Sequence, residues 1–187
     1  MREHATRRFE PGRHQKGVPI DRVKTQDVFA DQLNDLRSAE EQLVQALPKL
    51  AGAANSEELR HAFEEHLAQT REHFERVEDL LATSGVVRTG EVCVGMRGVI
   101  EEGSKAVEAS GDPMAKDAAL IAAAQRAEHY EIAAYGTAAT LADQLGLDEA
   151  HDVLGQTLDE EETADKLLTK IATGGMLRAG VNQRARR

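Results

Sequence analysis

Four long stretches of this chain repeat apolar residues every three or four positions, and this period constrains its fold most. They cover about residues 25–51, 56–83, 112–145 and 148–173. Side chains three or four positions apart lie on one face of an α-helix. At about 1.5 Å per residue, each stretch predicts a helix roughly 40–50 Å long. Four such helices, each with one apolar face, predict an all-α bundle.

The connections between these helices predict how they are arranged. Residues 52–55 and 146–147 are short links, which favour two antiparallel hairpins. A long crossover, residues 84–111, joins the hairpins and contains a short fifth helix at about residues 96–109. Ser56 is expected to cap the second helix. Two antiparallel hairpins joined by one long crossover form the ferritin-like four-helix bundle.

The two ends of the chain are basic and its middle is acidic. Residues 1–24 carry seven Lys and Arg against three Asp and Glu, and residues 174–187 carry four Arg and no acid. The 12 basic and 30 acidic residues of the middle repel nucleic acid, which excludes it as the main ligand. We therefore expect a flexible basic arm at 1–24, a ferritin-like helical bundle at 25–173 and a basic tail at 174–187.

Cysteine content and hydropathy indicate the compartment. The single cysteine, Cys93, excludes an intramolecular disulfide and a multi-cysteine zinc site. No run approaches the ~20 apolar residues of a membrane span. The N-terminal Arg and His residues are not followed by the apolar segment of a secretory signal. The sequence predicts a cytoplasmic protein that does not associate with membranes.

Metal-ligand residue types interrupt the apolar face of every long helix near its middle. An ionised carboxylate is costly to bury unpaired, so a face of Leu and Ala should exclude it. Residues three or four apart, such as Glu128 and Glu131, can converge on one ion or on two neighbouring ions. Carboxylates with imidazole suit Fe, Mn or Zn, and bundle cores often hold two carboxylate-bridged ions. The predicted metal ligands are Glu40, His66, Gln69, His73, Glu128, Glu131, Glu161 and Asp165.

Each of these residues also has a purely structural interpretation. Glu40 and Glu161 lie in acidic runs, where a solvated face is the usual arrangement. His66 and His73 can be interior histidines with ordinary hydrogen-bond partners. Tyr135 either donates a hydrogen bond to the site or only fills the core. The Glu-x-x-His motif of the generic two-metal bundle is absent at the positions that face the core.

Several segments resemble the YciE/YciF family of ferritin-like, stress-associated bacterial proteins. The resemblance covers about residues 25–173 and is carried by TQDVFADQLNDLRSAEEQLVQALPKLA, HAFEEHLAQTREHFERVEDLL, VIEEGSKAVEAS, AAAQRAEHYEIAAYGTAATLA and TLDEEETADKLLTKIA. It implies a five-helix ferritin-like fold, a homodimer, a di-iron or related metal site, and expression linked to stress. It does not imply an established biochemical activity.

The same resemblance bears on the site residues. By position, the family's acidic core residues correspond to Glu40, Glu128, Glu131, Glu161 and Asp165. The second helix departs from the family, because Gln69-Thr70 stands where the family pattern has Glu-Thr. A neutral amide is a weak metal ligand. The site would then hold one metal, bind a second one weakly, or use His66 or His73.

Two functions remain open from the sequence. The first is a redox protein in which bound Fe or Mn reacts with dioxygen or peroxide, and the second is a non-enzymatic dimeric stress protein that acts through protein contacts. In the second, a metal would be structural or absent. Whether the chain is an enzyme is left undecided. Iron storage is disfavoured, since nothing in the sequence points to the surfaces of a many-subunit cage.

Overall fold

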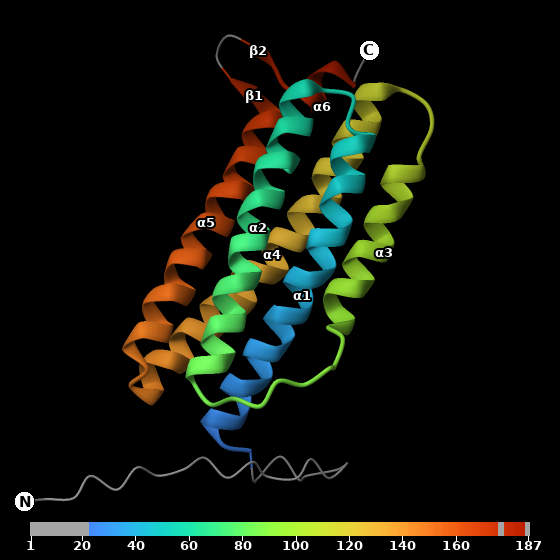
Figure 1. The fold of residues 1–187 in the computed structure, drawn as a ribbon. Coiled ribbons are helices and arrows are strands. Elements are labelled where there is room, and N and C mark those ends of the chain that lie inside the picture. Colours follow the sequence, from blue (N-terminus) through green and yellow to red (C-terminus); the bar gives the residue numbers. More distant parts are fainter. Residues whose placement is uncertain (1–22, 176–177, 186–187) are drawn as a thin grey trace, which may run out of the picture.

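The computed structural model describes residues 23–175 and 178–185, and most of these lie in helices (Figure 1). The all-α, ferritin-like bundle of two antiparallel hairpins is confirmed: α1 pairs with α2, α4 pairs with α5, and the crossover contains α3. The elements are α1 (Thr25–Ala53), α2 (Glu57–Thr83), α3 (Val94–Glu108), α4 (Pro113–Leu145), α5 (Asp148–Thr173), β1 (Gly174–Gly175), β2 (Arg178–Ala179) and α6 (Val181–Arg184). Residues 1–22 of the expected basic arm lie outside the described residues.

The apolar core has two parts, both built mainly from α1, α2, α4 and α5, and one of them also includes residues of α3 and α6. The α6-end core includes Leu43, Leu47, Leu59, Phe63, Leu120, Ile121, Leu168, Ile171 and Val181. The α1-start core includes Phe29, Leu33, Leu36, Val77, Leu80, Ala138 and Leu154. The helical period that predicted four apolar faces therefore buries those faces against one another. Between the two parts lies a polar layer, in which glutamate and histidine take the core positions.

The start of α2 is capped from another helix. Ser56 occupies the expected N-cap position, but its side chain makes no capping hydrogen bond. Instead the fully buried carboxylate of Asp117, on α4, accepts hydrogen bonds from the backbone N–H groups of Asn55 (2.8 Å) and Ser56 (2.7 Å). A negative charge at a helix N-terminus is favourable. Asp117 thus ties the α1–α2 turn to the second hairpin.

The crossover is anchored to α1 where α3 begins. Ser38 Oγ accepts a hydrogen bond from the backbone N–H of Cys93 (2.9 Å), and Gln42 Nε2 donates one to the Cys93 carbonyl (3.1 Å). The thiol of Cys93 is buried and lies 3.0 Å from the Tyr130 hydroxyl on α4. The crossover is therefore held to both hairpins at one point.

The described part of the C-terminal segment packs on the end of the bundle, where the sequence predicted a tail. β1 and β2 pair antiparallel, with Gly174 opposite Ala179, and Val181 of α6 is fully buried. Gly180 makes this return possible, because an added Cβ would lie 2.2 Å from the backbone nitrogen of Gly174. The segment is too short and too rich in Arg and Gly to show a helical period, so the sequence does not indicate that Val181 packs on the bundle.

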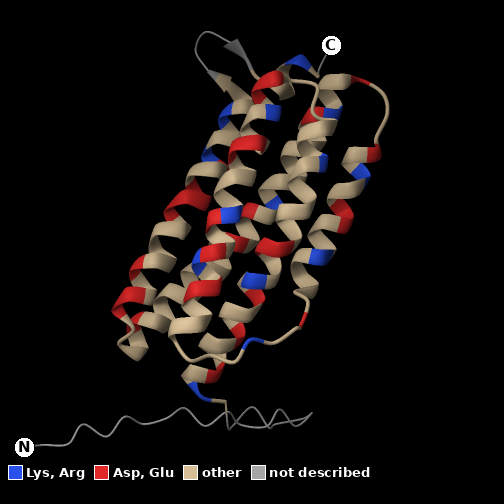
Figure 2. Ribbon diagram, in the orientation of Figure 1, with Lys and Arg blue, Asp and Glu red and all other residues tan. Residues whose placement is uncertain are grey.

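The outside of the bundle carries the excess of acid that the sequence shows. Acidic residues lie along each of the long helices, with basic residues among them (Figure 2). Many of the basic residues pair with acids one turn away, as Lys166 does with Glu162 at 2.8 Å. Within the described residues, no helix is both long and apolar enough to span a membrane.

Candidate metal centre

The polar layer brings six ionisable side chains from four helices into the middle of the bundle. All are at least nine-tenths buried, and Glu40, His73, Glu131 and Glu161 have no exposed surface. Each occupies a position of the three-and-four period that Leu or Ala occupies elsewhere, so the helix turns it inward. The six are Glu40 on α1, His66 and His73 on α2, Glu128 and Glu131 on α4, and Glu161 on α5.

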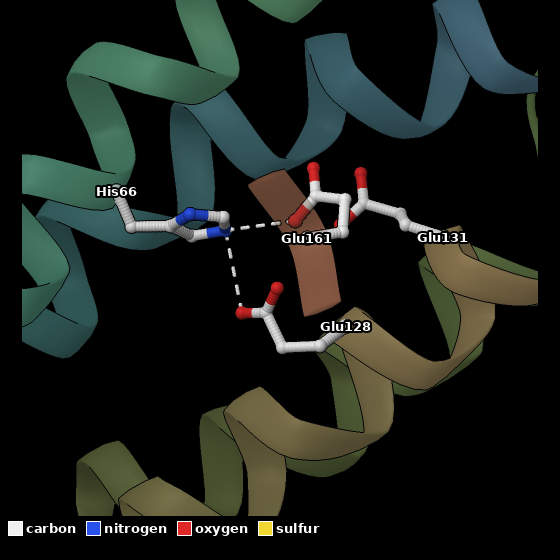
Figure 3. Close-up of side chains that lie close together, drawn as sticks. All are labelled: His66, Glu128, Glu131 and Glu161. Atoms are coloured by element: carbon white, nitrogen blue, oxygen red, sulfur yellow. Dashed lines mark ion pairs between the residues drawn. The ribbon is translucent and has the colours of Figure 1, made fainter. Parts of the chain in front are cut away.

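The first group of this layer forms around His66. Its ring points toward Glu128 and Glu161, with Nε2 3.3 Å from Glu128 Oε1 and 3.7 Å from Glu161 Oε2 (Figure 3). Glu131, one helical turn after Glu128, completes the group. Each of the four residues offers a ligand atom within 4.8 Å of the other three, a spacing at which one metal ion could be held.

The second group consists of Glu40, His73 and Glu161, and it shares Glu161 with the first. His73 Nδ1 lies 2.8 Å from Glu161 Oε1, without the alignment of a hydrogen bond, and 3.9 Å from Glu40 Oε1, which is beyond hydrogen-bond distance. The shared carboxylate gives Glu161 the position of a bridge between two ions. Carboxylate bridging is the usual arrangement of two-metal sites in bundle cores.

Three further residues hold these ligands, and two of them were not found from the sequence. Tyr135 donates a hydrogen bond from its hydroxyl to Glu40 Oε1, which decides between the two interpretations given above. Glu160 Oε2 lies 2.7 Å from His73 Nε2, and Arg76 Nη1 donates a hydrogen bond of 2.7 Å to the same oxygen. Glu160 is next to Glu161 in an acidic run. The sequence could not show that these two adjacent residues contact opposite sides of the His73 ring.

The carboxylates of the layer resist ionisation. Burial, and next the charge of Glu161, raise the pKa of Glu40 to about 8. Burial is also the largest cause that raises the pKa of Glu128 and of Glu131 well above the ordinary carboxyl range, with Glu161 again adding to it. Without a cation, these three side chains are therefore largely protonated at neutral pH.

Glu161 and the histidines behave differently from those three. Burial acts to raise the pKa of Glu161, but the close contact with His73 and the charges of both histidines outweigh it, so that this pKa is lowered. Burial lowers the pKa of His66. It acts in the same direction on His73, but Glu161, Glu40 and Glu160 outweigh it, and the pKa of His73 is raised.

Most oxygen atoms of the layer have no hydrogen-bond partner among the described residues. They include Glu40 Oε2, Glu128 Oε2 and both carboxylate oxygens of Glu131 and of Glu161. A buried polar atom without a partner costs about 1–3 kcal/mol, and more when it is charged. Native proteins rarely accumulate such atoms at one point. A metal ion accepts these lone pairs and balances the charge, so the donor set fits one.

Two predicted ligands lie outside both groups. Gln69 is exposed, and His66, one turn before it on α2, approaches the carboxylates instead. Asp165 accepts a hydrogen bond from Gln125 Nε2 (2.9 Å) and lies 3.5 Å from the exposed His129. The structure therefore brings together six of the eight predicted residues. A metal-binding role of any of the eight stays a prediction.

Comparison with known proteins identifies relatives of similar sequence and fold. Residues 24–185 match the model of a family described as a domain of unknown function, DUF892. The protein YciF of Escherichia coli strain K12 is 43% identical over 159 residues, which are 84% of this chain and 96% of YciF. The crystal structure of this E. coli stress protein matches with a TM-score of 0.76 and 46% identity, over 79% of this chain and 93% of that one.

A second solved structure is also similar. YcfI of Rhodopseudomonas palustris, for which a structural role has been suggested, has a TM-score of 0.77 and 34% identity, over 83% of this chain and 99% of that one. The matched region extends the similarity beyond the bundle to the C-terminal segment that packs on it. On this family match, these identities and the shared helical bundle, the chain belongs to the YciE/YciF family of ferritin-like proteins.

Proposed function

We propose that this protein binds two divalent transition-metal ions, Fe or Mn, in its polar layer and uses them in redox chemistry with dioxygen or peroxide. The observation that carries the proposal is the set of buried carboxylate oxygens without hydrogen-bond partners at one level of the bundle. Oxygen donors with imidazole are the ligands expected for these metals. When bound, the metals supply the electrons for reducing dioxygen or peroxide.

Charge balance supports two ions over one. The layer contains four glutamates, Glu40, Glu128, Glu131 and Glu161, and two histidines. If all four carboxylates are ionised and both imidazoles are neutral, two divalent cations make the layer neutral. One cation would leave two carboxylates that only protons could neutralise, since burial strongly disfavours an uncompensated charge. Protons are the alternative counter-charges, and the raised carboxyl pKa values indicate that they replace the metal when it is removed.

The residues of the chain divide between the two ions in a simple way. His66, Glu128 and Glu131 would hold one ion, Glu40 and His73 would hold the other, and Glu161 would lie between them. Tyr135 orients Glu40 through its hydroxyl. Glu160, itself held by Arg76, contacts the His73 nitrogen that faces away from the layer and thereby orients the ring.

The proposal is tested by metal content. Protein purified without added metal, and then titrated with Fe(II) under anaerobic conditions, should bind about two ions per chain. Glu161→Ala should lose both ions and Glu128→Ala at least one. Glu162→Ala is the matched control, because Glu162 is the next residue on α5 and points outward to Lys166. Metal content in Glu128→Ala and Glu161→Ala equal to wild type would refute the proposal.

A non-enzymatic role is the second candidate, and the names of the relatives favour it. YciF is called a stress protein and a structural role has been suggested for YcfI, so neither name specifies a reaction. In this case a homodimer in the cytoplasm would act on partner proteins through its acidic surface or its basic arms. Two results together would favour this function over the first: the protein as purified contains no metal, and its melting temperature is the same with and without chelator.

A further inference from the structure

A pocket leads from the surface of the bundle to the first metal group. It lies between α2 and α5, has a volume of about 200 Å³, and includes both His66 and Glu128 in its lining. Its outer lining is exposed, as at Gln69 and at Leu167, of which 37% is exposed. At its inner end, His66 is 6% and Glu128 2% exposed. The pocket therefore joins solvent to the ligands of one candidate ion.

The walls of this pocket are mostly apolar. Ala62 and Phe63 of α2 face Ala164 and Leu168 of α5 across it. The residues Glu65, Gln69 and Thr163, which supply polar atoms, are exposed. A path with an apolar lining disfavours hydrated ions, because their water must be removed before they enter. It admits small molecules without net charge.

The size of the pocket limits its ligand. One water molecule takes about 30 Å³ in the liquid, so about 200 Å³ holds several waters or one molecule of a few heavy atoms. Sites for drug-sized ligands and cofactors are about 300–1,000 Å³. The pocket is smaller than the usual site for a nucleotide-sized ligand, and dioxygen or hydrogen peroxide fits within it.

We infer that the α2–α5 pocket is the entrance through which a small uncharged oxidant, dioxygen or hydrogen peroxide, reaches the centre from the side of His66 and Glu128. The inference rests on the proposed function for the identity of the oxidant, but the pocket itself does not depend on bound metal. The second group is approached differently, because His73 is covered by Glu160 and Arg76 on its outer side. The oxidant would therefore meet the ion held by His66, Glu128 and Glu131 first.

Ala164 is the position at which the pocket can be closed with least change elsewhere. It lines the pocket and is half-buried, so Ala164→Leu places an isobutyl group in the path without removing a candidate ligand. Ala68→Leu is the matched control, since Ala68 is exposed on α2 and is not part of the lining. Leu167→Ala tests the opposite direction by widening the exposed rim.

The first measurement uses metal-free protein in solution under a pressure of dioxygen. Dioxygen is paramagnetic, so it speeds the NMR relaxation of the protein protons that it approaches. The methyl groups of Leu168, which line the pocket, should relax several-fold faster than those of Leu154, which is also buried on α5 (0% exposed, against 4% for Leu168) but lies in the α1-start core. Ala164→Leu should reduce the effect at Leu168 to the Leu154 level. Ala68→Leu should leave it unchanged, and Leu167→Ala should increase it.

The second measurement uses Fe(II)-loaded protein and follows its oxidation by hydrogen peroxide in stopped flow. Ala164→Leu should slow the oxidation several-fold at unchanged metal content, whereas Ala68→Leu should match wild type. Equal relaxation at Leu168 and Leu154 in wild type, or no effect of Ala164→Leu in either measurement, would overturn the inference. If wild type binds no metal, the proposed function fails, while the relaxation measurement still decides whether the pocket admits dioxygen.

Discussion

Removing metal should make the stability of this protein fall with rising pH, opposite to the usual behaviour of carboxylates. The pKa of Glu40 is about 8 in the folded protein, against 4.5 for an ordinary Glu side chain. A carboxyl whose pKa is raised by folding stabilises the protein fully below its unfolded pKa, and this stability is lost as pH rises through the folded pKa. The effect should therefore develop between about pH 4.5 and 8.

The magnitude follows from the number of protons that only the folded state holds. Each such proton costs about 1.4 kcal/mol of stability per pH unit, so Glu40 alone gives a loss of roughly 2 kcal/mol between about pH 6.5 and 8. The raised pKa values of Glu128, Glu131 and His73 act in the same direction. The lowered pKa of His66 opposes them mainly below its unfolded value of about 6.5, which is why the test starts there.

Urea unfolding of chelator-treated protein, followed by circular dichroism between about pH 6.5 and 8, measures this slope. Glu40→Gln should make the slope of stability against pH less steep by up to about 1.4 kcal/mol per pH unit, the contribution of one proton. The amide keeps an acceptor for the Tyr135 hydroxyl but cannot titrate. With saturating Mn(II), the slope should reverse, since the metal competes with protons for the same oxygens. A metal-free stability that is constant or rises over this range, or an unchanged slope in Glu40→Gln, would refute the account of the polar layer.

Three further variants test other contacts. Asp117→Ala should lower the free energy of unfolding by about 1–3 kcal/mol, because two backbone N–H groups lose their acceptor; Asp112→Ala, which removes one exposed cap of α4, should cost less in the same denaturation series. Gly180→Ala should release α6, seen as faster amide exchange at Val181 with little change in the α1-start core; unchanged exchange would contradict the packing described. Tyr135→Phe should destabilise the metal-free protein by about 1–3 kcal/mol while keeping its metal content, and loss of metal would instead make Tyr135 essential for binding.

The fold was predictable because its signal is spread along the whole chain. The apolar period spans four segments, so an error at one position does not change the result, and Gly146, with φ of 69°, marks the end of α4 plainly. The helix at residues 94–108 was also expected, two residues out of place at its start. By contrast, Val181 lies in a short basic segment without a helical period, and its packing depends on the close approach at Gly180.

The candidate site was predictable where a strong apolar pattern fixes the phase of a helix. Glu128 and Glu131 lie among Ile121, Ala124 and Ala138, and both are buried as that phase requires. Asp165 shares the spacing of a core residue, but helix α5 turns it toward Gln125 at the edge of the layer. The contact of Glu160 with His73 joins residues 87 positions apart, and no local pattern indicates such a pair.

The polar layer also has a consequence for how the helices align along the bundle axis. The Leu and Ala faces above and below it are nearly repetitive, so sliding one helix by a turn, about 5.4 Å, would exchange one apolar contact for another at modest cost. The same slide would separate Glu40 from Tyr135 and His73 from Glu160, and would bury charged groups against leucine. The layer of glutamate and histidine therefore contributes to the axial register of the bundle, as a polar core position does in a coiled coil.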